Sequence, residues 1–139
     1  MVWIFEGSEQ VVIPPSKPYG FVYEIENLVS GRKYIGKKFL WSKKIRIIKG
    51  KKKRSLVESD WKKYHGSNGK LLEDIDKLGI SNFRKTILRF CYNKSECAYW
   101  ELKYQISADA LLSEDYYNEW IMVKIRKANL RNATKINST

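Results

Sequence analysis

Five side chains of this protein are candidates for moving a proton or holding a cation: Tyr23, Tyr34, His65, Glu101 and Asn118. Phenol and imidazole groups can exchange a proton with a bound water, and a carboxylate can pair with a cation or bind a divalent metal. An amide can hold such a group in place by hydrogen bonding. Because these residues are far apart in the sequence, they can act together only if the fold brings them around one hollow.

The two tyrosines lie in short runs that are each typical of a β-strand. Apolar or aromatic side chains occupy every second position of residues 20–26, and residues 34–36 form the second run. The segment 27–31 between them contains residues that favour a tight turn. We therefore expect a hairpin on which Tyr23 and Tyr34 face one another. In the alternative interpretation, both rings serve only packing at the edge of the core.

Glu101 belongs to a predicted helix that begins near Asn93, where Glu96 completes a capping-box pattern, and continues to about Ser107. One stripe of this helix carries a thiol, two aromatic rings and a carboxylate, at Cys97, Trp100, Glu101 and Tyr104. A carboxylate on an apolar stripe costs free energy unless a cation meets it. Glu101 should therefore form an ion pair with a lysine or arginine, or bind a metal, and the residues leave both alternatives open.

The remaining pattern predicts one domain of moderate size. Apolar residues at helical spacing predict a helix over 70–78 that ends at Gly79, and 83–90 reads as the third strand of a sheet. Residues 1–13 are expected to add a strand or hairpin at the sheet edge, and prolines at 14, 15 and 18 end it. After 110–118 returns to the sheet, 120–125 is expected to form a further short strand.

We divide the chain into an N-terminal extension at 1–19, a domain at 20–126 and a basic tail at 127–139. No apolar run approaches the roughly 20 residues that span a bilayer, and the first residues do not resemble a signal peptide. We therefore expect a cytoplasmic protein without membrane contact, in which Cys91 and Cys97 are free thiols.

The formal net charge of +12 is concentrated in one part of the chain. Residues 32–70 contain fifteen lysines and arginines and only two acids, Glu58 and Asp60. Such a concentrated positive field favours a polyanion, of which nucleic acid is the usual one. A membrane surface is a poorer partner, because the basic segment shows no long amphipathic helix.

The basic insertion spans about 37–58. Its centre, 43–54, holds eight cations and no anion among twelve residues. We expect this run to be an extended free segment that becomes ordered on a phosphate backbone, and a merely solvated loop is the alternative. The residues predicted to bind nucleic acid are Lys37, Lys38, Lys43, Lys44, Lys49, Lys51, Lys52, Lys53, Arg54, Lys62 and Lys63.

Several of these features together resemble the GIY-YIG nucleases, and in particular the small phage-encoded, homing-type members. The resemblance rests on Gly20-Phe21-Val22-Tyr23, Tyr34-Ile35-Gly36, the run 61–67, the helical Glu101 and Tyr117-Asn118, and it covers about 20–126. It implies an α/β (α+β) domain with a small three-stranded antiparallel sheet flanked by helices.

The resemblance also implies an activity, a metal-dependent endonuclease that hydrolyses phosphodiester bonds of double-stranded DNA. Tyr23 would accept a proton from the attacking water, with Tyr34 placed across the hairpin. Glu101 would bind one divalent cation, Mg²⁺ or Mn²⁺. Asn118 would support the glutamate or the metal, and His65 would relay the proton, unless these two serve only capping or surface roles. A phage-encoded protein would act in the host cytoplasm or nucleoid.

The catalytic arginine of the family is the point of departure. The family places it about eight residues past the glycine of Tyr-Ile-Gly, where this chain has Lys44. Lysine keeps the charge but loses the bidentate fork that suits a phosphate. We predict Arg46 for this role, with Arg54 and Lys44 as alternatives.

Two other functions remain open at this stage. The first is a non-catalytic DNA-binding protein on the same fold. The second is an RNA-binding module, in which Trp41, Trp61 and Tyr64 would stack on unpaired bases. For a nuclease, sequence specificity would come from the basic insertion or from a homodimer on DNA.

Overall fold

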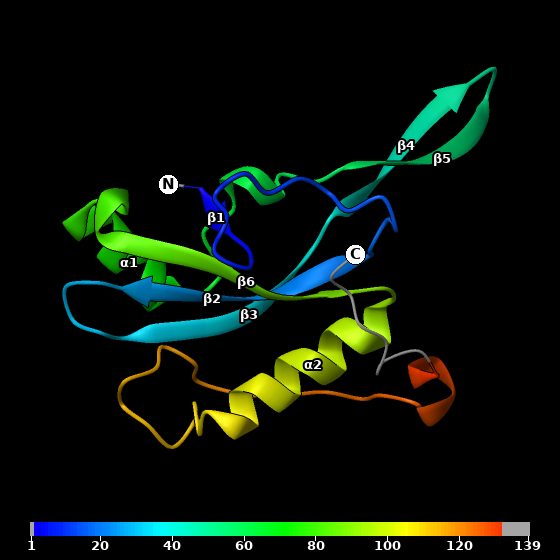
Figure 1. Ribbon diagram of the computed structural model, residues 1–139. Helices are drawn as coiled ribbons and strands as arrows, with labels where there is room; N and C mark the ends of the chain where they lie inside the picture. Colours follow the sequence, from blue (N-terminus) through cyan, green and yellow to red (C-terminus); the bar gives the residue numbers. More distant parts are fainter. Residues whose placement is uncertain (1, 132–139) are drawn as a thin grey trace.

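The computed structural model describes residues 2–131, and its centre is a four-stranded sheet in the order β1-β6-β2-β3 (Figure 1). Its strands are β1 (Trp3–Ile4), β2 (Gly20–Asn27), β3 (Lys33–Phe39) and β6 (Phe83–Cys91). Strands β2, β3 and β6 are antiparallel, as expected, and the short β1 adds a parallel strand beside β6. The predicted α/β fold is therefore confirmed, with a mixed sheet in place of a purely antiparallel one.

Two helices lie against this sheet. They are α1 (Gly69–Leu78) and α2 (Lys94–Ser107), and short 3₁₀ turns occur at η1 (Trp61–Lys63), η2 (Ile80–Asn82) and η3 (Lys127–Leu130). The Asn68 and Asn93 side chains cap α1 and α2 by accepting from the Leu71 and Glu96 amides. Gly79 ends α1 at φ 87°, which a residue with a Cβ rarely adopts. Both helices are where the sequence predicts them.

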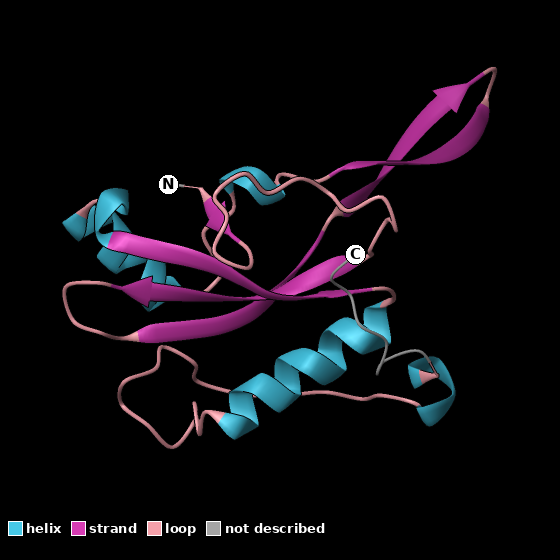
Figure 2. Ribbon diagram, in the orientation of Figure 1, coloured by secondary structure: helices cyan, strands magenta, loops and turns pink. Residues whose placement is uncertain are grey.

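The sheet has a core on each face. One cluster joins β1, β2, β6, η1 and α1 around Phe21, Tyr23 and Trp61. The other joins β2 and β3 to α2 through Val22, Ile35 and Cys97 (Figure 2). Residues of β2 alternate between the two clusters because successive side chains of a strand point to opposite faces. Strand β3 forms the edge of the sheet opposite β1.

Two predictions are wrong. The basic run is not a free segment, because β4 (Trp41–Ile48) and β5 (Lys51–Glu58) form an antiparallel hairpin. Lys49 and Gly50 at its tip both have positive φ, 52° and 73°, the geometry of a tight turn matched to strand twist. In addition, 120–125 has no regular secondary structure. Segment 110–118 does return to the sheet, where Tyr116 forms a parallel bridge with Lys33.

Within residues 2–131, no helix combines the length and the apolar character needed to cross a bilayer. Of the predicted basic tail, 132–139 lies outside the described residues.

Candidate active site

A cavity of about 490 Å³ opens beside β3 and collects most of the residues singled out above. Its walls include Tyr23, Tyr34, Lys37, Lys38, Glu101 and Asn118. Strand β2 contributes the first of these, β3 the next three, α2 the glutamate and the C-terminal segment the asparagine. Four of the six residues predicted to be catalytic thus converge on one hollow.

The strand register brings the two phenols to the same face of the sheet. Tyr23 pairs with Gly36 and Ile25 pairs with Tyr34, so the two tyrosines lie diagonally across β2 and β3. Their ring centroids are 6.1 Å apart. Tyr23 is 1% exposed, whereas Tyr34 is half-buried at the cavity wall. The predicted facing arrangement on a hairpin is confirmed.

Gly36 is required by the Tyr23 phenol, which lies across it. A Cβ at position 36 would stand 2.5 Å from the Tyr23 hydroxyl oxygen and 2.9 Å from a carbon of the Tyr34 ring. At Gly20, a Cβ would meet the Lys38 carbonyl oxygen of β3 at 2.6 Å and Cys97 Sγ of α2 at 3.0 Å. The absence of a side chain at position 36 leaves room for the two phenols. Its absence at position 20 lets α2 approach the sheet closely.

The pKa of Tyr23 is raised well above its ordinary value, mainly by burial and further by Tyr64, Tyr34 and Glu101. Lys37 and Lys38 line the same cavity, yet loss of solvent sets the direction of this pKa shift. Burial also raises the pKa of Tyr34, partly opposed by a hydrogen bond with Ser67. Both phenols hold their protons at neutral pH.

Tyr64 is a site residue to which sequence reasoning assigned no role in the chemistry. It is a hydrogen-bond partner of Tyr23, and the two rings meet edge to face at 5.9 Å. Lys38 Nζ lies 4.2 Å from the centre of the Tyr64 ring and 2.7 Å from Asp60 Oδ1. Tyr64 directly follows η1 and belongs to the run 61–67. The place of this run in the family resemblance was the signal that could have identified Tyr64 as a site residue.

Glu101 is held by Lys37, whose Nζ lies 3.1 Å from Oε1. Burial raises the pKa of Glu101, and the Lys37 ammonium opposes that shift. Of the two alternatives for this carboxylate, the ion pair is observed. The glutamate side chain lines the cavity and remains 19% exposed, so the carboxylate is accessible to a further ligand.

The donor set fits a divalent cation that takes most of its ligands from water and substrate. Among the described residues, no three His, Cys, Asp or Glu side chains form a cluster able to enclose a metal. Mg²⁺ commonly uses one or two carboxylates together with phosphate oxygens and waters. Among the described residues, Glu101 and Glu119 are the carboxylates that line the cavity, and Glu119 pairs with Lys70.

Asn118 uses its amide on the backbone of β3. Its Oδ1 accepts from the Ile35 amide at 3.1 Å, and its Nδ2 donates to the Ile35 carbonyl at 2.8 Å. The neighbouring Tyr117 hydroxyl donates to Asp74 of α1 at 2.6 Å and accepts from Asn27 at 3.0 Å. This pair fastens the C-terminal segment along the free edge of β3, beside the cavity.

Two other predicted residues lie away from this hollow. Arg46 is exposed on β4, and His65 is half-buried, and neither is among the described residues that line the cavity. Burial lowers the pKa of His65, and Lys85 adds to this effect. The two cations of the cavity wall are instead Lys37 and Lys38. The catalytic roles of Arg46 and His65 remain predictions.

The aromatic residues suggested for stacking on RNA bases are not presented to solvent together. Trp61 is 2% exposed, and its backbone carbonyl accepts from Trp3 Nε1. Trp41 is half-buried and donates from Nε1 to the Pro18 carbonyl at 3.0 Å. The RNA-stacking interpretation is therefore wrong for Trp61, which is a core residue.

Residues 3–121 match the family model described as "Putative endonuclease segE, GIY-YIG domain". A curated protein of that name from Enterobacteria phage T4 is 34% identical over 100 residues, which are 72% of this chain. The aligned region spans only 40% of the length of that relative. No solved structure matches significantly.

Proposed function

Because the chain belongs to the segE-type GIY-YIG domain family, we propose that it is an endonuclease that hydrolyses phosphodiester bonds of duplex DNA with the help of a divalent cation. The observation that carries this proposal is the convergence of Tyr23, Tyr34 and Glu101 on one cavity that also holds two lysines. Phosphodiester hydrolysis needs a held water, a route for its proton and positive charge near the phosphate.

The positive charge comes from Lys37 and Lys38. Both residues line the cavity, and each ammonium group pairs with one acid, Glu101 for the first and the exposed Asp60 for the second. A phosphate entering the cavity meets these charges in a partly enclosed site, where they act more strongly than in water. The lysines therefore position the scissile phosphate and favour the charge that develops on its oxygens.

The water proton leaves through neutral phenols. Because burial raises the pKa of Tyr23, a preformed phenolate base is unfavourable at neutral pH. We assign to Tyr23 a relay role, in which its oxygen accepts the water proton while its own proton passes to the hydrogen-bonded Tyr64. The Tyr64 hydroxyl releases its own proton in turn to solvent, to which this half-buried residue has access. Tyr34, with its hydroxyl bonded to Ser67, orients the water from the other side.

Glu101 would hold the divalent cation through its cavity-facing oxygen, with Mg²⁺ preferred over softer metals because the ligand is a hard oxygen. When bound, the cation supplies charge stabilisation and activation of oxygen ligands. Lys37 keeps the glutamate oriented toward the cavity in the metal-free protein. Asn118 acts indirectly, because its amide is committed to the Ile35 backbone beside Tyr34.

The simplest test incubates the full chain with supercoiled plasmid and Mg²⁺, beside a sample with excess EDTA. We expect nicked or linear DNA only with Mg²⁺. Duplex binding without cleavage at any Mg²⁺ or Mn²⁺ concentration would favour the alternative, a non-catalytic DNA-binding protein on this fold.

A further inference from the structure

The β4–β5 hairpin stands apart from the rest of the protein. Figures 1 and 2 show it projecting beyond the sheet, and within the described residues its strands pair only with each other. Every residue of the two strands is exposed except Trp41, which is half-buried. An isolated two-stranded hairpin is marginally stable in water, so this element gains from a partner that covers it.

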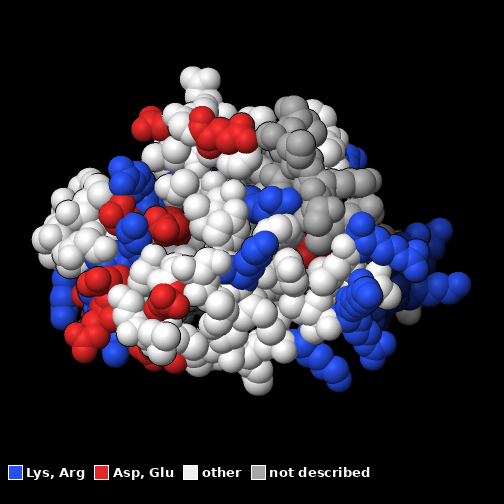
Figure 3. Space-filling model, turned by 60° about the horizontal axis from the view of Figure 1, so that its bottom comes forward, with Lys and Arg blue, Asp and Glu red and all other residues white. Residues whose placement is uncertain are grey.

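Charge identifies the chemistry of that partner. Residues 41–58 carry eight lysines and arginines and a single acid, Glu58. In Figure 3, the basic side chains gather at the end of the molecule that the hairpin forms, and most acidic side chains lie toward the other end. A cationic element of this density binds a polyanion and gains from counterion release.

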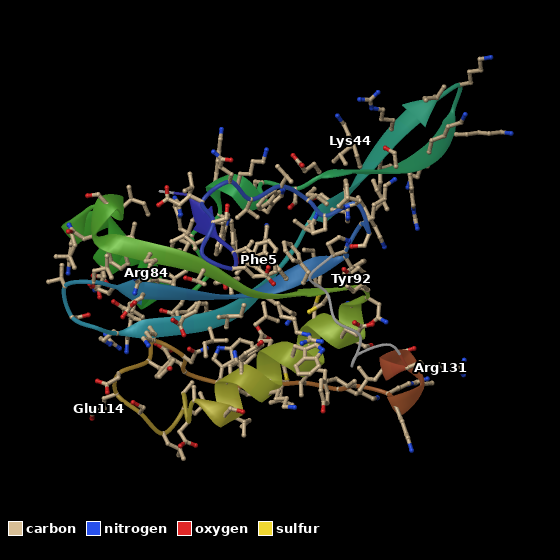
Figure 4. The ribbon with its side chains drawn as sticks, viewed as in Figure 1. Phe5, Lys44, Arg84, Tyr92, Glu114 and Arg131 are labelled. Carbon is tan, nitrogen blue, oxygen red and sulfur yellow. The ribbon has the colours of Figure 1, made fainter. Side chains whose placement is uncertain are left out.

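The pairing register divides the hairpin into two unlike faces (Figure 4, where Lys44 marks β4). One face, here called the mixed face, carries Lys43, Ile45, Ile47, Lys52, Arg54 and Leu56. The opposite face, here called the cationic face, carries Lys44, Arg46, Ile48, Lys51, Lys53, Ser55 and Val57. The assignment follows from strand alternation, since cross-strand partners share a face.

The mixed face needs an explanation beyond charge. Ile45, Ile47 and Leu56 are 58%, 74% and 66% exposed, and they stand together between cations. A surface that only neutralised phosphates would gain nothing from exposed aliphatic groups. The floor of a DNA major groove offers a partner for the aliphatic side chains and a partner for the cations. Thymine methyl groups are apolar, and guanine presents hydrogen-bond acceptors to arginine.

We propose that the hairpin enters the major groove of duplex DNA with its mixed face toward the base edges, while the cationic face contacts the phosphates that flank the groove. This inference rests on the proposed function only in taking duplex DNA as the substrate. A two-stranded ribbon fits the major groove, about 12 Å wide, and is too broad for the minor groove, about 6 Å wide.

The hairpin also begins at the cavity. Trp41 and Ser42 at its base line the cavity wall, and the Trp41 bond to the Pro18 carbonyl fixes this base to the domain. Eight residues of strand extend about 26 Å, which is the rise of about eight base pairs. The bases that the hairpin reads should therefore lie within about eight base pairs on one side of the cut.

Arg54 and Arg46 give a matched pair for the test. They are the same residue type near the same point of the hairpin, because Ile45 pairs with Arg54 and Arg46 pairs with Lys53, yet they lie on opposite faces. The protein for this test is the full chain carrying Glu101→Gln, so that cleavage is suppressed and binding alone is measured. The probe is a pool of 30-base-pair duplexes with a randomised centre.

Selection from this pool is expected to enrich a short sequence block. Adding Arg54→Gln should weaken binding of the selected duplex by roughly 5- to 150-fold and remove the preference at one base pair. Adding Arg46→Gln should weaken binding of selected and unselected duplexes alike. The slope of binding affinity against salt should fall by the equivalent of about one phosphate contact, and the sequence preference should be kept.

A second pair tests the aliphatic groups without changing charge. Ile45→Ser with Ile47→Ser should remove a thymine preference, because serine has no methyl group to contact thymine, while Ile48→Ser with Val57→Ser on the cationic face should keep it. The proposal is overturned if no sequence is enriched, if both arginine variants behave alike, or if single-stranded RNA binds more tightly than the duplex at the same salt. If the wild-type protein, which keeps Glu101, fails to cut plasmid, these binding results stay unchanged. That failure would count only against the nuclease assignment.

Discussion

Lys37 Nζ and Glu101 Oε1 lie 3.1 Å apart, and this contact links β3, the strand that carries Tyr34, to the helix that carries the carboxylate. The pair explains how a glutamate is accommodated on the apolar side of α2. It also sets the electrostatics of the cavity, because burial raises the pKa of Glu101 while Lys37 opposes that rise. The first prediction follows from this balance.

Glu101 must be ionised to hold a cation, so cleavage should fall on the acid side at a pH above the ordinary glutamate value of 4.5. Lys37→Met removes the charge that lowers this pKa and should move the acid limb to higher pH. Lys38→Met is the control, because Lys38 pairs with Asp60 instead. An NMR titration of the Glu101 carboxyl gives the same comparison where cleavage is slow. Equal acid limbs in the wild type and Lys37→Met would contradict the assigned pairing.

Removing the Tyr23 hydroxyl should abolish the proposed proton relay. We expect Tyr23→Phe to lower the single-turnover cleavage rate by roughly 10²- to 10⁴-fold with unchanged duplex affinity. Tyr64→Phe should also slow cleavage, since it removes the next hydroxyl of the relay. A Tyr64→Phe rate equal to that of the wild type would show that the Tyr23 proton leaves by another route.

Gly36 should tolerate no side chain. Gly36→Ala places a methyl group 2.5 Å from the Tyr23 hydroxyl oxygen, and overpacking of this kind costs about 1–3 kcal/mol of unfolding free energy. Gly69→Ala, in the first turn of α1, has no heavy atom within 4 Å of the added carbon and should be neutral or stabilising. Urea denaturation of both variants measures this difference, and equal midpoints would mean that the phenol adapts to the added methyl group.

Lys85 should make stability depend on alkaline pH. It is a buried lysine of β6 whose Nζ donates to the Tyr64 carbonyl at 2.8 Å, and burial lowers its pKa to about 8. The unfolded chain keeps this proton to about pH 10.4, so between pH 8 and 10 it binds more protons than the folded state. Wild-type unfolding free energy should therefore rise with pH in this window relative to Lys85→Met. Parallel pH profiles would show that the ammonium is not desolvated.

Local sequence patterns predicted most of the strands and helices that position the site residues. Strand alternation located Tyr23 and Tyr34, and the caps at Asn93 and Gly79 set one end of each helix. These features depend on neighbours in the sequence, so no long-range information was needed.

The remaining features depend on long-range packing or on weaker signals. The pKa of Tyr23 follows from its complete burial, and Lys37 was one of many lysines that could have met Glu101. The hairpin was missed because eight like charges indicated repulsion, although Lys49-Gly50 between isoleucines and lysines is a turn signal. Lys85 points to the same face of β6 as Phe83 and Ile87, and this alternation could have indicated that it is buried.

The proposed hydrolytic centre depends on Glu101. Its most direct test compares wild type with Glu101→Gln in Mg²⁺ on supercoiled plasmid, with affinity for an uncut duplex measured on the same preparations. We predict nicked or linear product from the wild type, at least 100-fold slower cleavage by Glu101→Gln, and equal duplex affinity. Cleavage by Glu101→Gln at the wild-type rate, or duplex binding with no cleavage by either protein, would contradict this prediction.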